Sequence, residues 1–143
     1  MLNMDFLCDL SAGLIAIGEH QEALTLTTNA IDVQRRGGKY LYMPALFRMK
    51  GLILASRSAE DYFEAKGSLL SAIDWAKRQS ATLFELKAAT DLAELSLKQG
   101  RLPEAYKHLS AAFDRTPTRI VSPDQERALQ VLNRLQSDTK AVG

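Results

Sequence analysis

Few residues of this chain have the types and spacing that catalysis or metal binding requires. His108 stands four residues after Glu104, about one helical turn, and His20 follows a glycine in an expected turn. A metal site needs three or four ligands and an acid–base site needs a second positioned group, but no further ligand recurs at helical spacing beside either histidine. Cys8 falls in an apolar helical pattern and is expected to be a small core residue. We therefore expect no enzyme activity, no metal site and no cofactor.

Two other local patterns could suggest a phosphate or nucleic-acid ligand. Gly37 and Gly38 end a helical pattern instead of joining a strand to a helix, so a helix stop is expected there and not a phosphate cradle. Arg35, Arg36 and Lys39 form a local basic cluster beside two tyrosines. The whole chain has 18 basic and 17 acidic residues with their signs interspersed, and its formal net charge is +1. Such a chain has no overall field to hold a nucleic-acid backbone, so no nucleic-acid partner is expected.

The apolar runs are short and the cysteine content is low. Runs such as 13–17 and 51–55 fall far below the roughly 20 residues of a membrane-spanning helix. The first residues include Asp5 and Asp9 and lack a basic lead, unlike a signal peptide. One cysteine allows no disulfide within the chain, which suits a reducing compartment. We expect a cytoplasmic protein without a membrane partner.

The elements that must position any functional residue are helices. Apolar residues recur three or four positions apart over most of the chain, and no segment alternates as a strand does. Gly18, Gly100, Pro44 and Pro103 mark helix ends and starts. A chain of 143 residues is expected to form one domain, here residues 1–136. The pattern predicts helices at about 3–17, 22–35, 42–56, 59–79, 82–99, 103–115 and 123–136, followed by a disordered tail over 137–143.

A short phrase occurs three times: a Glu-Ala pair followed, seven residues after its Ala, by another Ala and a large apolar residue. The copies are Glu22-Ala23 with Ala30-Ile31, Glu64-Ala65 with Ala72-Ile73, and Glu104-Ala105 with Ala112-Phe113. Seven residues are two helical turns, so both alanines lie on one helix face. Twelve to fourteen residues before the first alanines stand Ser11, Gly51 and Ala93, all small. The pattern predicts three close helical hairpins, about 3–36, 42–79 and 82–115, with a capping helix over 123–136.

This pattern is similar to the tetratricopeptide (TPR) repeat, in which a small residue with a nearby leucine precedes a Glu-Ala pair and a second alanine. Pro117 falls twelve residues after Ala105, where the TPR pattern carries its closing proline. The separations of 42 and 40 residues between phrases differ from the 34 of TPR. The usual aromatic positions are mostly leucine or alanine. The resemblance implies an all-α, right-handed TPR-like α-α superhelix of seven helices.

Residues of about 37–136 also resemble the C-terminal TPR-like segment of large bacterial regulators. These are multidomain ATPase-type proteins, some with adenylate cyclase or winged-helix transcription-activator domains. The resemblance rests on Gly37-Gly38, Met49-Lys50-Gly51, Glu85-Leu86-Lys87-Ala88-Ala89, Gly100-Arg101 and the stretch 124–135. In that family the segment resembles a sensing or scaffolding array, and the nucleotide chemistry lies elsewhere in the chain. The sequence leaves open whether this chain is a fragment of such a protein.

In a TPR-like array the first helix of each hairpin lines the concave surface. Matching positions on the helices at 42–56 and 82–99 assign as partner-facing Arg48, Lys87, Thr90, Glu94 and Lys98. The alternative is a solvated stripe whose charges pair within one helix, Lys87 with Asp91 and Glu94 with Lys98. Trp75 lies at the edge between buried and exposed faces, where it either packs between repeats or contacts a partner.

The sequence thus predicts a non-enzymatic protein–protein interaction module of a bacterial signalling or regulatory protein. The expected partner is a protein or peptide segment bound in the concave groove. Two alternatives stay open, a self-association module that forms a homodimer and a small-molecule-sensing domain. The identity of the partner and the oligomeric state are not predicted.

Overall fold

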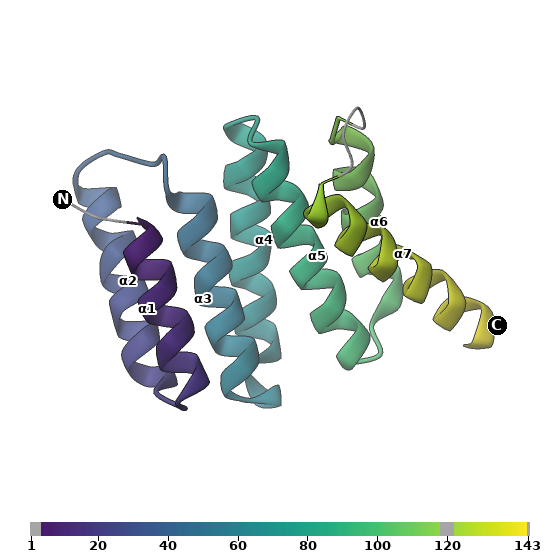
Figure 1. Cartoon of the computed structure of the whole chain (residues 1–143), viewed down its shortest axis with the longest axis horizontal. Coiled ribbons are helices and arrows are strands. Elements are labelled where there is room, and N and C mark those ends of the chain that lie inside the picture. The colour runs from purple at the N-terminus through teal and green to yellow at the C-terminus, as the bar shows by residue number, and fades with distance from the viewer. Residues whose placement is uncertain (1–3, 118–121, 143) are drawn as a thin grey trace.

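A computed structural model describes residues 4–117 and 122–142 of the chain, and all regular structure in these ranges is helical. The prediction of an all-α fold with seven helices is confirmed for these residues (Figure 1). The helices are α1 (Met4–Ala16), α2 (His20–Arg36), α3 (Met43–Arg57), α4 (Tyr62–Arg78), α5 (Thr82–Lys98), α6 (Leu102–Arg115) and α7 (Pro123–Val142), with a 3-10 turn η1 (Ala59–Asp61) before α4.

The helices form two layers. Each helix packs on the next one along the chain, and α1, α3, α5 and α7 also pack on one another in that order. In Figure 1 these odd-numbered helices lie in front, and α2, α4 and α6 lie behind them. The helix-packing contacts fit a helical superhelix built from the hairpins α1–α2, α3–α4 and α5–α6. Helix α7 packs on both α5 and α6, as a capping helix would.

The repeated alanines form the contact between the layers. All six alanines of the Glu-Ala phrases are buried, with at most 5 % of their surface exposed. Ser11 and Ala93 are buried on α1 and α5, opposite these alanines in the sequence pattern. On α3, a Cβ added to Gly51 would lie 2.7 Å from Cγ of Leu69 and 3.2 Å from the carbonyl oxygen of Ala65. At Gly51 the close approach of α3 and α4 therefore requires a residue without a side chain, as the small-residue pattern predicted.

The helix ends follow from local hydrogen bonds. Gly38 adopts a φ of +63°, and the next amide, that of Lys39, donates to the carbonyl of Gln34 at 3.0 Å, which closes α2 as a helix stop. At the start of α7, the amide of Gln125 donates to the hydroxyl of Ser122 at 3.2 Å. The amide of Ser122 in turn donates to the side-chain oxygen of Gln125 at 2.8 Å. This reciprocal pair is a capping box.

Two boundaries differ from the predicted ones. The predicted helix at 59–79 is divided, because Ser58 caps a 3-10 turn, accepting from the amide of Glu60 at 3.1 Å, before α4 begins at Tyr62. Helix α7 extends to Val142 instead of ending near 136, so most of the stretch expected to be a disordered tail is helical. The last residue of the predicted tail, Gly143, lies outside the described residues.

Candidate partner-binding groove

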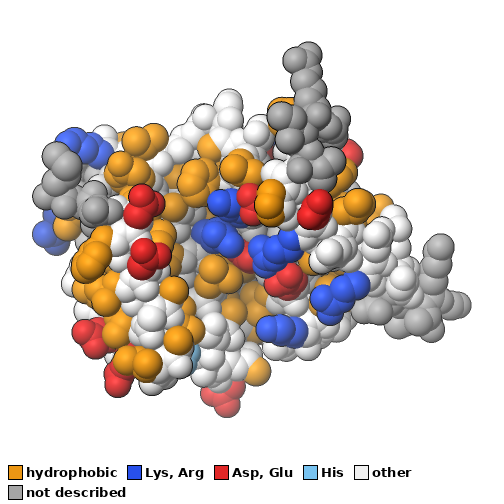
Figure 2. Space-filling model, viewed as in Figure 1, with side chains coloured by type: hydrophobic (Ala, Val, Ile, Leu, Met, Phe, Trp, Pro, Cys, Tyr) orange, Lys and Arg blue, Asp and Glu red, His pale blue; other side chains and the backbone are white. Residues whose placement is uncertain are grey.

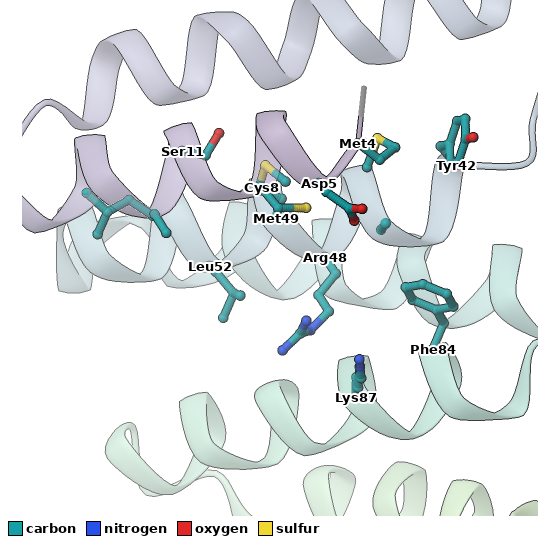
Figure 3. Close-up of a pocket in the computed structure, with 13 residues that line it drawn as sticks. Met4, Asp5, Cys8, Ser11, Tyr42, Arg48, Met49, Leu52, Phe84 and Lys87 are labelled. Carbon is teal, nitrogen blue, oxygen red and sulfur yellow. The ribbon is translucent and has the colours of Figure 1, made fainter. Parts of the chain in front are cut away.

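A cavity of about 480 Å³ opens on the face formed by the odd-numbered helices. Three segments line it: α1, the start and middle of α3, and the first turns of α5 (Figure 3). Its lining is mainly apolar and includes Met4, Ala12, Ile15, Tyr42, Ala45, Met49, Leu52 and Phe84. The volume lies within the range of small-ligand and side-chain pockets. We call this space the α1–α3–α5 cavity.

One end of the cavity is cationic. Figure 3 shows the side chains of Arg48 from α3 and Lys87 from α5 directed into the gap between these two helices. The Arg48 guanidinium pairs with the carboxylate of Asp91, whose side chain is 1 % exposed. Asp5 and Cys8 of α1 also line the cavity. The space is thus amphipathic, with apolar walls, the cations Arg48 and Lys87 at its α5 side and the acid Asp5 on its α1 side.

The carboxylates of α5 are bonded to arginines of other helices. Asp91 accepts from Arg48 of α3 and, at 2.8 Å, from Nη2 of Arg127 on α7. The same Arg127 guanidinium donates to both oxygens of Glu94, at 2.9 and 3.3 Å. These bonds tie α3, α5 and α7 together in one ionic network. The predicted pairs within α5, Lys87 with Asp91 and Glu94 with Lys98, are replaced by pairs between helices.

The lysines of the groove have much looser contacts with carboxylates than these arginines have. The ammonium of Lys87 lies 3.9 Å from Oδ2 of Asp124 and 5.6 Å from the centre of the Phe84 ring. Lys98 is exposed and lines a second hollow of about 270 Å³ together with Glu94, Leu97 and Arg134. Figure 2 shows Lys and Arg side chains gathered over the middle of this face, beside a hydrophobic region over α1 and α3. The face therefore combines apolar surface with lysines that lack a close carboxylate partner among the described side chains.

Four of the five residues predicted on the first helices of the hairpins lie on this face. Arg48 and Lys87 line the α1–α3–α5 cavity, and Glu94 and Lys98 line the second hollow. The prediction was wrong for Thr90, which is only 1 % exposed and whose hydroxyl donates to the carbonyl of Leu86 at 2.7 Å. Thr90 is one helical position from Asp91 and points into the core, so it is not available to a partner.

Trp75 does not belong to the groove. It is half-buried on α4, in the other layer, and its ring stacks on that of Tyr40 with centres 5.2 Å apart and planes 16° apart. The Arg78 guanidinium also lies over the Trp75 ring, 5.0 Å from its centre. Of the two predicted roles, the structure shows packing of Trp75 against the loop between α2 and α3.

Cys8 was not predicted to line the groove. The apolar pattern of α1 predicted a core position, but Cys8 is exposed and lines the α1–α3–α5 cavity. The neighbouring Ser11 also lines the cavity, and its buried hydroxyl has no hydrogen-bond partner among the described residues. The signal that could have found both is their spacing from Met4 to Ile15, at which positions 4, 8, 11 and 15 follow one helix face.

The environment of Cys8 predicts slow alkylation of its thiol. Partial burial raises the pKa of the Cys8 thiol above its ordinary value, the Asp5 carboxylate raises it further, and Arg48 and Lys87 oppose the shift. Only the thiolate is nucleophilic, so the iodoacetamide reaction at pH 8 should be slower than that of an unfolded cysteine peptide. The rate should keep rising as the pH passes the ordinary cysteine pKa.

Asp5→Asn should accelerate labelling at pH 8 by roughly two- to threefold, because loss of the nearby negative charge lowers the pKa of the thiol. Asp9→Asn is the matched control, since Asp9 has a weaker influence on the thiol, and should accelerate it less. The measurement is the pH–rate profile of labelling followed by mass spectrometry. A profile that levels off below pH 8 would contradict this description of the cavity.

The histidines stand apart from the groove. His20, expected in a turn, is the first residue of α2, and its Nδ1 lies 3.2 Å from the carbonyl oxygen of Gly18. His108 on α6 lies 3.9 Å from Glu104, and its burial lowers the pKa of the imidazole more than that carboxylate raises it. Among the described residues, no three His, Cys, Asp or Glu side chains are grouped as a metal ion would require.

The comparisons with known proteins identify no similar protein. Family models, curated proteins and solved structures were searched, and none of them matches this chain. No helix in the described part of the chain has the length and apolarity needed to cross a membrane.

Proposed function

We propose that the chain is a protein–protein interaction module that binds a peptide segment of a partner in the groove formed by α1, α3 and α5. The observation that carries this proposal is the α1–α3–α5 cavity, about 480 Å³ in volume, with apolar walls and a cationic end. Binding energy in such grooves comes from a few side chains that bury themselves in pockets, while flanking polar groups fix the register. The cavity is large enough for one or two large apolar side chains of a partner.

A non-enzymatic role in a bacterial regulatory protein is part of the same proposal. The sequence resemblance to the C-terminal arrays of such regulators supports it. The ionic network supports it as well, because it fixes α3, α5 and α7 relative to one another and so keeps the groove preorganised before a partner arrives.

A random dodecamer peptide library displayed on phage tests the proposal without knowledge of the natural partner. Peptides enriched on the full chain should bind at least about tenfold more weakly after Cys8 is alkylated with N-ethylmaleimide, because the adduct fills the cavity after folding is complete. Ala45→Trp should have the same effect, since Ala45 lines the cavity from α3.

The matched controls leave the cavity open. Cys8→Ala treated with N-ethylmaleimide should retain binding, and so should Lys107→Trp, an exposed position on α6 that lines neither the cavity nor the second hollow. Circular dichroism melting checks that each variant is folded. Failure to enrich any peptide, or enriched peptides that bind the alkylated chain unchanged, would contradict the proposed function.

A further inference from the structure

We infer that the partner segment carries a large apolar side chain with an acidic residue two positions away, and a second acidic residue about four or six positions further along. This inference rests on the proposed function and specifies the chemistry of the partner. The apolar side chain enters the α1–α3–α5 cavity, the first acid meets Lys87, and the second meets Lys98.

Two arginines of the groove, Arg48 and Arg127, are already matched by acids. Arg48 and Arg127 share the buried carboxylate of Asp91, and Arg127 also holds Glu94 through both of its oxygens. A carboxylate of the partner would add little binding energy at these guanidiniums, because they are already engaged in charge-assisted hydrogen bonds to the buried Asp91. These groups therefore shape the floor of the groove and do not select the partner's charge.

Lys87 and Lys98 have charge left to satisfy, and so has Arg134, which lines the second hollow and forms no ion pair with the described side chains. The Lys87 ammonium has one loose contact, 3.9 Å from Asp124, and its side chain is 29 % exposed at the mouth of the cavity. Lys98 is exposed in the second hollow and forms no ion pair with the described side chains. Both lysines favour a partner with negative charge, because a partner carboxylate at either ammonium would add an ion pair without breaking a close ion pair of the chain.

The spacing of the two lysines sets the spacing of the acids. Lys87 and Lys98 are eleven residues apart on α5, which corresponds to about 16 Å along the helix axis. An extended peptide advances about 3.3 Å per residue and its side chains alternate between two faces, so two acids that both face α5 are about four or six residues apart. Because Lys87 lines the cavity and Lys98 does not, the apolar side chain and the acid two positions from it occupy the Lys87 end.

The same dodecamer library tests this pattern. Peptides enriched on the wild-type chain should contain Asp or Glu at two positions about four or six residues apart, one of them two positions from a large apolar residue. A representative synthetic peptide, labelled with fluorescein, should bind Lys98→Glu about tenfold more weakly in fluorescence polarisation. Replacing the distal acid of the peptide by lysine should restore its affinity for Lys98→Glu to within about threefold of the wild-type pair. Lys107→Glu, the control for net charge, should bind the original peptide unchanged.

The outcomes separate this inference from the proposed function. Peptides that lose binding after Cys8 alkylation but show no acidic enrichment, or that bind Lys98→Glu unchanged, would overturn the inference and leave the groove as the binding site. Failure of the charge-swapped peptide to recover affinity for Lys98→Glu would also overturn it. Peptides that are insensitive to alkylation of Cys8 would overturn the proposed function itself.

Discussion

Gly51→Val is expected to lower the free energy of unfolding by about 3 kcal/mol or more, and to be among the most damaging single substitutions in the chain. A Cβ at this position would lie 2.7 and 2.9 Å from two atoms of the Leu69 side chain and 3.2 Å from the carbonyl oxygen of Ala65. The carbonyl belongs to the backbone of α4 and cannot rotate away, so α3 and α4 must separate. Separation opens the buried contact between the layers at its centre. Urea denaturation measures the loss.

Gly67→Ala is the control, because it adds a Cβ to a helix glycine where nothing lies within 4 Å of the new atom. Alanine lowers the conformational freedom of the unfolded chain, so Gly67→Ala should raise the free energy of unfolding by about 0.5–1 kcal/mol. If Gly51→Val were as stable as the wild type, α3 and α4 could not be packed as closely as described.

The second large effect is expected when Asp91 loses both of its arginines. Arg48→Met combined with Arg127→Met leaves a carboxylate that is 1 % exposed without its two hydrogen-bonded cations. An uncompensated buried charge is costly, and the double variant should lose about 3 kcal/mol of unfolding free energy. Adding Asp91→Leu should recover most of this loss, since replacing a whole buried ionic cluster with apolar residues is often nearly neutral.

A second ion pair on the surface gives the control. Arg57 and Asp61 form an i, i+4 pair with a distance of 2.8 Å, at the turn between α3 and α4. Arg57→Met should leave the denaturation midpoint nearly unchanged, because solvent screens this pair. A triple variant no more stable than the double variant would contradict the view that the buried charge of Asp91 causes the loss.

The fold could be predicted from the sequence because small residues leave a clear periodic signal. The Glu-Ala phrases placed six alanines on helix faces, and all six are buried. Gly51 and Ser11 were found by counting back from these alanines, and the structure gives both a buried place at a helix contact. Spacing along one helix needs no knowledge of distant partners. The assignment to a TPR-like subclass stays a prediction.

The site could be predicted only in part, because it depends on how separate helices are rotated against each other. Arg48 and Lys87 were predicted correctly from the expectation that the first helix of each hairpin lines the groove. The prediction for Thr90 was wrong, because neighbouring positions on a helix differ by about 100° in direction and Thr90 points into the core. Arg127 was not assigned because its role requires α7 to lie across α5, which no local pattern encodes. Cys8 was not assigned to the groove, although its spacing from Met4, Ser11 and Ile15 places all four residues on one face of α1.

Self-association and small-molecule sensing also stay predictions. Leu10 on α1 and Ile17 in the turn after it are exposed, 38 % and 73 % accessible, and neither lines the α1–α3–α5 cavity. These side chains lie at the open end of the array. They would be the first place to seek contacts with a second copy.

The location of a bound peptide tests the central claim most directly. Amide chemical shifts of the isotopically labelled chain, recorded during titration with an enriched dodecamer, report which helices the peptide touches. The proposed groove predicts that the largest changes fall on α1, α3 and α5 around Cys8, Ala45 and Lys87, with few on α2, α4 and α6. Changes centred on the layer of α2, α4 and α6, for example around Trp75, would contradict the claim that the cavity side is the binding face.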